Sequence, residues 1–223
     1  MYRKTFTLIA LLTATLAFSL AAEPAAKPII FFVQQDMRPG VDDYGFENGF
    51  TWLVKNLPAD RDLVFVSFVN TDYKEEYAGK AGKLDGVPGS FKFRATSTAT
   101  NPYKTLAKYL KDKGIRETTV YVIGDGVSQD LLQMSDTGSP MDNFAFVPDR
   151  YPPLPQLVDY CKKNEIRLVG FFVQRKPVAV RAPSFTLYRD AFLYIMDNTK
   201  GEGYWNFTSF EGIFQAAMKK YFK

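Results

Sequence analysis

Short apolar runs alternate with amphipathic stretches along most of the chain. Four runs are rich in β-branched and aromatic residues, as in strands that are buried on both faces of a sheet, and they cover residues 28–33, 63–69, 118–123 and 166–173. Apolar positions with helical spacing occupy residues 46–57, 101–113, 154–164, 185–196 and 210–222, and a short strand is expected at 203–207. Strands that alternate with helices predict βαβ units.

We therefore expect a three-layer α/β/α Rossmann-like sandwich with a mostly parallel sheet of about six strands. The polar stretch 72–94 contains short candidate strands at 76–78 and 91–93, which predict one antiparallel edge strand. The segment 135–156 is too long for a routine connection, and such loops are usually functional or disordered. Nothing within residues 28–223 resembles a domain boundary, which predicts a single domain.

The first residues are typical of a secretory signal peptide. Arg3 and Lys4 precede an uncharged apolar run over residues 5–20, and small residues at Ser19 and Ala21 suit a signal peptidase. We expect a signal peptide over 1–21 and a short linker over 22–27. The alternative is an uncleaved anchor, although the run is short and Thr-rich for a membrane span. The Ala-rich style is typical of bacterial export, which predicts a periplasmic or extracellular protein with no membrane span in the mature chain.

Charge and residue usage exclude several classes of function. Without Arg3 and Lys4, 26 of the 28 Lys and Arg remain against 24 Asp and Glu, and a balance this even gives no case for nucleic acid or an acidic membrane. The chain has no histidine, which removes Ser-His-Asp and Cys-His nucleophile systems and imidazole zinc sites. The single cysteine, Cys161, lies in a predicted helix, where we expect a buried apolar side chain and not a reactive thiol.

Four features follow one another in a fixed order. The buried run PIIFFV ends in an acidic loop, and Thr100-Asn101 opens the helix in TATNPYKTLAKYL. The strand TVYVIGDG runs into a turn, and a last helix, SFEGIFQAAMKKYF, follows the segment TKGEGYWNF. In this order the features resemble a von Willebrand factor A domain over nearly all of residues 28–222. The Thr100 segment is similar to that family's threonine loop, and TVYVIGDG to its TDG turn with Gly124 in place of Thr.

The resemblance implies a cation site that has degenerated. Family members typically bind a divalent cation through an Asp-x-Ser-x-Ser pattern after the first strand, together with the threonine loop and the TDG turn. Here residues 34–40 read QQDMRPG. If Gln34 takes the Asp place, the hydroxyl places hold Asp36 and Arg38; if Asp36 takes it, they hold Arg38 and Gly40. Both alignments lose the hydroxyls and place an arginine beside the cation.

A hard cation prefers several oxygen ligands, mostly anionic, whereas Arg38 offers only donors and a fixed positive charge. We therefore expect no cofactor. If Mg²⁺ or Ca²⁺ is bound, the expected ligands are Asp36, Thr100 and Asp125. The alternative is that these three residues form loops and cap helices, which their types also favour.

The segment VIGDGVSQD also resembles the GDGxxD motif of haloacid-dehalogenase-like phosphatases, in which Asp125 and Asp130 would hold magnesium. That family needs an Asp nucleophile directly after the first strand and a second Asp two residues later. This chain has Gln34 in the nucleophile place, and without that carboxylate no phospho-aspartyl intermediate can form. A Mg-dependent phosphatase is thus the weaker alternative.

The positive case for binding is geometric. Ligands of parallel α/β sheets meet the loops at the carboxyl ends of the strands. In this chain those loops contain aromatic and basic residues, and aromatic and arginine residues are enriched at interface hot spots. The candidate partner-binding residues are Arg38, Phe144, Phe146, Arg150, Tyr151, Arg175, Lys176 and Arg181. The alternative is that the rings pack under the loops and the charges are only solvated.

The segment QRKPVAVRAPS is locally basic, which favours an acidic partner surface. The sequence therefore predicts a non-catalytic protein-binding or adaptor module of von Willebrand factor A type, acting in the periplasm or cell envelope. A structural subunit of an envelope assembly is the alternative.

Overall fold

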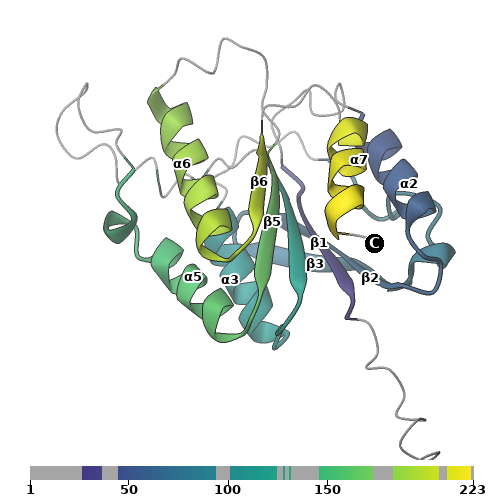
Figure 1. The fold of residues 1–223 in the computed structure, drawn as a ribbon, viewed down its shortest axis with the longest axis horizontal. Coiled ribbons are helices and arrows are strands. Elements are labelled where there is room, and N and C mark those ends of the chain that lie inside the picture. Colours follow the sequence, from purple (N-terminus) through teal and green to yellow (C-terminus); the bar gives the residue numbers. More distant parts are fainter. Residues whose placement is uncertain are drawn as a thin grey trace, which may run out of the picture.

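A six-stranded sheet forms the centre of the computed structural model, in the order β3-β2-β1-β4-β5-β6 (Figure 1). The structure describes residues 27–36, 45–93, 101–124, 128, 131, 146–172, 183–205 and 210–221. The strands are β1 (Ile29–Gln34), β2 (Asp62–Val69), β3 (Asp72–Lys80), β4 (Thr119–Gly124), β5 (Arg167–Phe172) and β6 (Glu202–Trp205). β1, β2, β4, β5 and β6 pair in parallel, and β3 pairs antiparallel with β2 at one edge. These features confirm the expected fold class.

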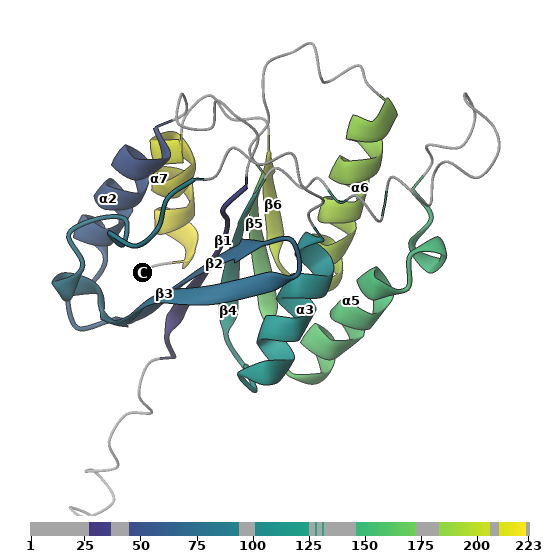
Figure 2. The ribbon, with the colours of Figure 1, turned by 180° about the vertical axis from the view of Figure 1, so that it is seen from behind.

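Helices cover both faces of the sheet, as Figures 1 and 2 show from opposite sides. One face carries α3 (Pro102–Asp112), α5 (Pro153–Lys163) and α6 (Pro183–Asn198), and the other carries α2 (Phe46–Asn56) and α7 (Phe210–Tyr221). Two short 3₁₀ helices, η2 (Ala81–Lys83) and η3 (Pro148–Arg150), lie in the connections. Because every strand except β2 is followed by a helix in the described chain, the parallel pairings arise from crossovers over the two faces.

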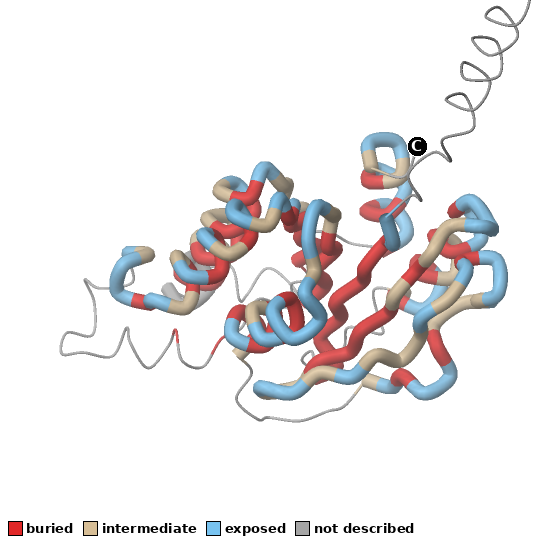
Figure 3. Tube along the Cα trace, turned by 90° about the horizontal axis from the view of Figure 1, so that it is seen from below, coloured by how far each residue is buried: buried red, intermediate tan, exposed pale blue. Residues whose placement is uncertain are grey.

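The sheet separates two apolar cores, and β1 contributes to both. Ile30 and Phe32 point into the core beneath α3, α5 and α6, while Phe31 points into the core beneath α2 and α7. Phe32 stacks on Phe68 with ring centroids 4.4 Å apart, and Phe31 meets Phe50 edge-on at 5.2 Å. The layer of buried chain between exposed outer surfaces is visible in Figure 3.

The antiparallel edge differs from its predicted form. β3 is a single strand of nine residues, of which the sequence indicated only the middle. Residues 91–93 form no strand, although this segment lies within the described part of the chain. Phe91 instead packs its ring on Phe65 at 5.1 Å and on Phe46 at 6.0 Å. The aromatic pattern that predicted a strand therefore reflects burial against the core.

Glu76 is the extra residue of a β-bulge. Phe65 pairs with Tyr77 and Val66 pairs with Glu75, so Glu76 has no partner in the register. Its side chain is only 2% exposed. It accepts hydrogen bonds from Ser67 Oγ at 2.7 Å, Ser90 Oγ at 2.5 Å and Lys74 Nζ at 2.7 Å. The carboxylate thus joins β2, β3 and the segment that leads to Phe91.

Burial alone would raise the pKa of Glu76, but the hydrogen bonds from Lys74, Ser90 and Ser67 outweigh it and hold the pKa below the ordinary 4.5. A carboxyl group with a lowered pKa in the folded state stabilises the fold above its unfolded pKa. That contribution is lost as the pH falls through the folded pKa.

Substitution of Glu76 by Gln should lower the free energy of unfolding at neutral pH by about 1–3 kcal/mol, because charge-assisted hydrogen bonds are lost at a buried position. The deficit should shrink at acidic pH, as the pH falls through the lowered folded pKa and wild-type Glu76 also becomes neutral. Urea unfolding at both pH values measures the difference. Glu47→Gln, on the exposed face of α2, is the control and should change stability by less than about 0.5 kcal/mol. A Glu76 deficit that is independent of pH would contradict this account.

Within the described ranges, no helix is long and apolar enough to cross a membrane. The predicted signal peptide and most of the linker lie in residues 1–26, outside those ranges.

Candidate functional site

The order of the strands reverses between β1 and β4, which creates a topological switch point at the carboxyl edge of the sheet. From β1 the chain continues to β2 on one side, whereas β4 lies on its other side and leads to β5. Open α/β sheets bind ligands at such a point. Here the end of β1 carries three consecutive polar residues, Gln34, Gln35 and Asp36, which are 1%, 7% and 4% exposed. These buried polar groups mark the edge as the candidate functional site.

Gln34 closes the floor of the switch point. Its side chain lies across the backbone of Gly124, the last residue of β4, so closely that a Cβ at Gly124 would be 2.6 Å from Gln34 Oε1. A cavity of ≈ 10 Å³ adjoins this contact. Its walls come from β2, α3 and α6 and include Phe68, Tyr103 and Phe192. A volume of this size has room for about one water molecule.

Hydrogen bonds from buried side chains anchor the segments around this edge. Gln35 donates its backbone N–H to Phe68 O at 2.8 Å and its Nε2 to Lys92 O at 2.8 Å. At the start of α3, Thr105 Oγ1 is 2.8 Å from Asn70 O. Asn70 has φ 54°, a left-handed conformation that Asn tolerates better than most residues. The β2–β3 turn and the first turn of α3 are therefore held together beside the switch point.

Of the expected cation ligands, the structure describes only Asp36, which is buried next to Gln35. Thr100, Asp125 and the competing Arg38 lie outside the described residues. Among the residues that are described, no three carboxylate or cysteine side chains gather in a way that could hold a metal ion. The degenerate cation site therefore stays a prediction.

Two of the predicted partner-binding residues lie on the flank formed by η3, α5 and α6. Phe146 is half-buried and packs on Tyr194 of α6 with ring centroids 5.5 Å apart. Arg150 is exposed at the end of η3. Phe144, Arg175, Lys176 and Arg181 lie outside the described residues.

Tyr151 requires a correction. It is only 3% exposed and belongs to the core beneath α3, α5 and α6, so it is not available as a surface contact. The sequence places it next to exposed residues, but the chain turns inward at the end of η3 to begin α5.

Two residues on this flank were not predicted from the sequence. Val147 is 39% exposed, more than any other large apolar side chain among the described residues. Tyr194 packs on Phe146, the residue that precedes Val147. Burial, Asp149 and Asp159 raise the pKa of the Tyr194 phenol. Val147 follows Phe146 in a segment without periodicity, and Tyr194 lies on a helix whose apolar positions suggest only a core face, so neither had a sequence signal. We name Phe146, Val147, Arg150 and Tyr194 the α5–α6 flank.

Cys161 is fully buried in α5 and forms no disulfide. Burial raises the pKa of its thiol to about 12. These observations confirm the expected apolar role.

The fold is similar to part of a solved pilus adhesin. The chain superposes on the pilus adhesin SpaC from Lactobacillus rhamnosus GG, in its open conformation, with a TM-score of 0.55 and 14% identity over 88% of this chain. Another crystal form of that adhesin gives a TM-score of 0.55, with 13% identity over 86% of this chain. In both cases the chain spans about 30% of the adhesin's length. Identity this low shows the fold alone.

Human COPII-coat protein Sec24c is matched at a TM-score of 0.44, with 12% identity over 81% of this chain and 30% of Sec24c. The sequence matches no known family model and no curated protein.

Substitution of Gly124 by Ala should destabilise the protein by about 1 kcal/mol, because the added methyl group overlaps Gln34 Oε1 and the end of that side chain must move. In a Gln34→Ala background the same substitution should cost less, since the overlapping atom is gone. Thermal or urea unfolding of the four proteins gives the coupling energy. Gly89→Ala is the matched control, since a Cβ there meets nothing within 4 Å. An equal cost of Gly124→Ala in both backgrounds would show that Gln34 does not fill this space.

A thiol-specific disulfide reagent should react with Cys161 at least about 100-fold more slowly in the native protein than in the urea-unfolded chain, because the thiol is buried and has a raised pKa. Absorbance of the released leaving group measures both rates. Rapid reaction in native buffer would instead indicate that α5 opens easily.

Proposed function

We propose that this chain is an exported, non-catalytic protein-binding module of von Willebrand factor A type, which recognises its partner at the carboxyl edge of the sheet and along the α5–α6 flank. The observation that carries the proposal is the filled switch point, where Gln34 lies across Gly124.

Filling of the switch point favours surface recognition over chemistry on a small molecule. A neutral amide occupies the end of β1, and the adjoining cavity of ≈ 10 Å³ has room for about one water. Small-molecule sites commonly enclose several hundred Å³. Protein partners need no such crevice, because they bind to exposed side chains over a wide area.

The α5–α6 flank provides side chains of the type that protein interfaces use. Val147 and Arg150 are exposed beside the half-buried ring of Phe146. Aromatic residues and arginine are enriched at such surfaces, and hot spots form where a partner excludes water from them. The packing of Phe146 on Tyr194 holds its ring in place before a partner arrives, which lowers the entropic cost of binding.

Two further observations agree with a role outside the cytoplasm. The N-terminal sequence is typical of a secretory signal peptide. The fold is similar to part of a pilus adhesin. We therefore place the protein in the periplasm or at the cell surface of a bacterium, as an adaptor without a bound cofactor.

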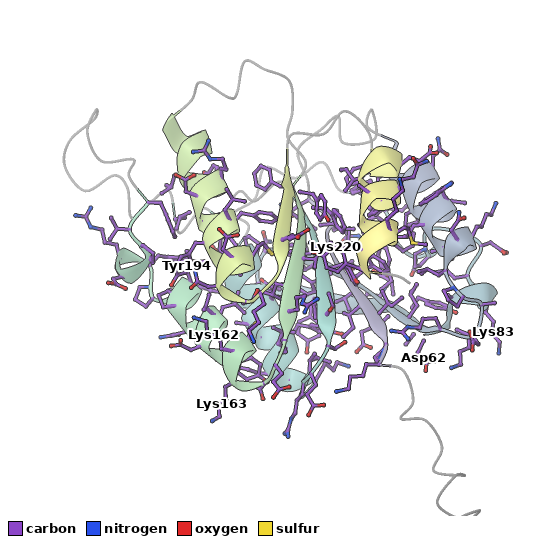
Figure 4. The ribbon with its side chains drawn as sticks, viewed as in Figure 1. Asp62, Lys83, Lys162, Lys163, Tyr194 and Lys220 are labelled. Atoms are coloured by element: carbon purple, nitrogen blue, oxygen red, sulfur yellow. The ribbon has the colours of Figure 1, made fainter. Side chains whose placement is uncertain are left out.

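Site-specific photo-crosslinking in the producing cell tests the proposal. A photoreactive amino acid at Val147 or at Arg150 should give a discrete protein adduct, because both side chains are exposed on the proposed surface. The control positions are Lys83 and Asp62, which Figure 4 shows on the opposite side of the molecule from Tyr194. They should give no adduct of the same size.

Equal adducts at the control positions, or none at Val147 and Arg150, would count against binding on this flank. Hydrolysis of a phosphoester by the purified protein would contradict the non-catalytic role. Elution of the purified protein as a large obligate assembly would favour the alternative of a structural subunit.

A further inference from the structure

The amino edge of the sheet, opposite the carboxyl edge, carries a compact group of exposed cations. They are Lys111 in the last turn of α3, Arg116 in the turn that follows it, and Lys162 and Lys163 in the last turn of α5. We name these four residues the basic corner. Figure 4 shows Lys162 and Lys163 at the lower end of α5, far from Lys83.

Backbone contacts bring the two helix ends together. The Glu117 N–H donates to Asn164 O at 2.6 Å, which joins the turn that carries Arg116 to the turn that follows Lys163. Across the helix pair, Tyr160 Oη donates to Leu110 O at 3.2 Å, and Lys111 Nζ lies 5.8 Å from the centroid of the Tyr160 ring. The four cations therefore form one surface, although they come from segments 46 residues apart or more.

Four acidic residues lie near these cations along the chain, and two of them have partners elsewhere. Glu117 pairs with Lys27, and Asp112 accepts a hydrogen bond from Tyr73 at 3.0 Å on the β3 side of α3. Asp159 lies close enough to Tyr194 to raise the pKa of that phenol. Glu165 remains in the turn between Lys163 and β5. None of the four cations forms an ion pair with a carboxylate in the described part of the chain.

The helix dipole explains only part of this arrangement. Cations in the last turn of a helix are favourable on their own, which accounts for Lys111, Lys162 and Lys163 one at a time. Arg116 lies outside either helix, in a turn held against the end of α5, and its guanidinium adds to the same exposed surface. Like charges on one surface repel one another, which costs electrostatic free energy. An anionic partner removes this cost when it binds.

We propose that the basic corner is a second docking surface, which binds an acidic segment of a partner protein while the carboxyl edge remains free. Arginine and tyrosine are enriched at protein interfaces, the lysines add charge that is complementary to carboxylates, and the small area suits a short acidic run. Four cations are at the lower limit of the clusters that bind anionic membranes, and a lipid surface is therefore the competing outcome of the experiment. The even net charge of the chain conceals this surface, because the fold gathers cations that the sequence disperses.

Binding of a fluorescent, glutamate-rich peptide to the purified exported protein tests the proposal by anisotropy at low and moderate salt. The wild type should bind this peptide and not the matched glutamine-rich peptide, with an affinity that falls as salt increases. The variant K162E/K163E should bind at least about tenfold more weakly. The control K55E/K83E makes the same change of net charge at exposed lysines on α2 and η2, and its affinity should stay within about twofold of the wild type.

A second variant protects the test against a folding defect. Arg116→Gln with Lys111→Gln leaves α5 unchanged and should also weaken binding at least about tenfold, with an unaltered circular dichroism spectrum. Equal loss of affinity in K162E/K163E and K55E/K83E would overturn the proposal, because it would show attraction by net charge only. Binding to vesicles of anionic phospholipid without binding to the peptide would overturn it in favour of a membrane surface. None of these results depends on the photo-crosslinks at Val147 and Arg150.

Discussion

Burial of β1 on both faces is the constraint on which the rest of the structure depends. All six of its residues are buried, with Ile30 and Phe32 in one core and Phe31 in the other. A strand of this kind is stable only if helices cover both sides of the sheet, so the three layers follow from it. The same position, between β2 and β4, places the end of β1 at the switch point. The core and the candidate site are therefore consequences of one strand.

The elements that could be predicted from the sequence are those whose burial leaves a continuous apolar run or a helical period. β1, β2, β4 and β5 are of this kind, and so are the helices that pack on them. β3 could not be predicted in full. An edge strand with one neighbour shows little alternation of apolar and polar residues, and the bulge at Glu76 shifts that alternation partway along the strand. At Phe91 the sequence predicted a strand where the structure has a loop. Aromatic residues of a loop that packs on the core resemble those of a strand in the sequence.

The candidate site was predictable only where position along the chain determines place in the fold. Gln34 and Asp36 follow a buried strand, so the sequence alone put them at the carboxyl edge of the sheet. Tyr151 is one residue beyond exposed Arg150, yet its ring lies in the core, because the direction of a side chain at the end of a 3₁₀ turn depends on the helix that follows. The basic corner needs the pairing of the turns after α3 and α5, a tertiary contact with no local sequence pattern.

The two ends of the sheet have different chemistry because parallel strands impose direction. Every crossover returns the chain to the same edge, so the ends of α3 and α5 lie together at the amino edge, and their carbonyl ends favour cations there. At the carboxyl edge, the end of β1 instead carries the buried polar residues Gln34, Gln35 and Asp36. The central strands β1 and β4 are six residues long, or about 20 Å, a separation larger than the Debye length at physiological salt. Charge at one edge is therefore screened from the other. A domain built in this way can hold an acidic partner at the amino edge while the carboxyl edge stays available to another partner, with little electrostatic interference between the two edges.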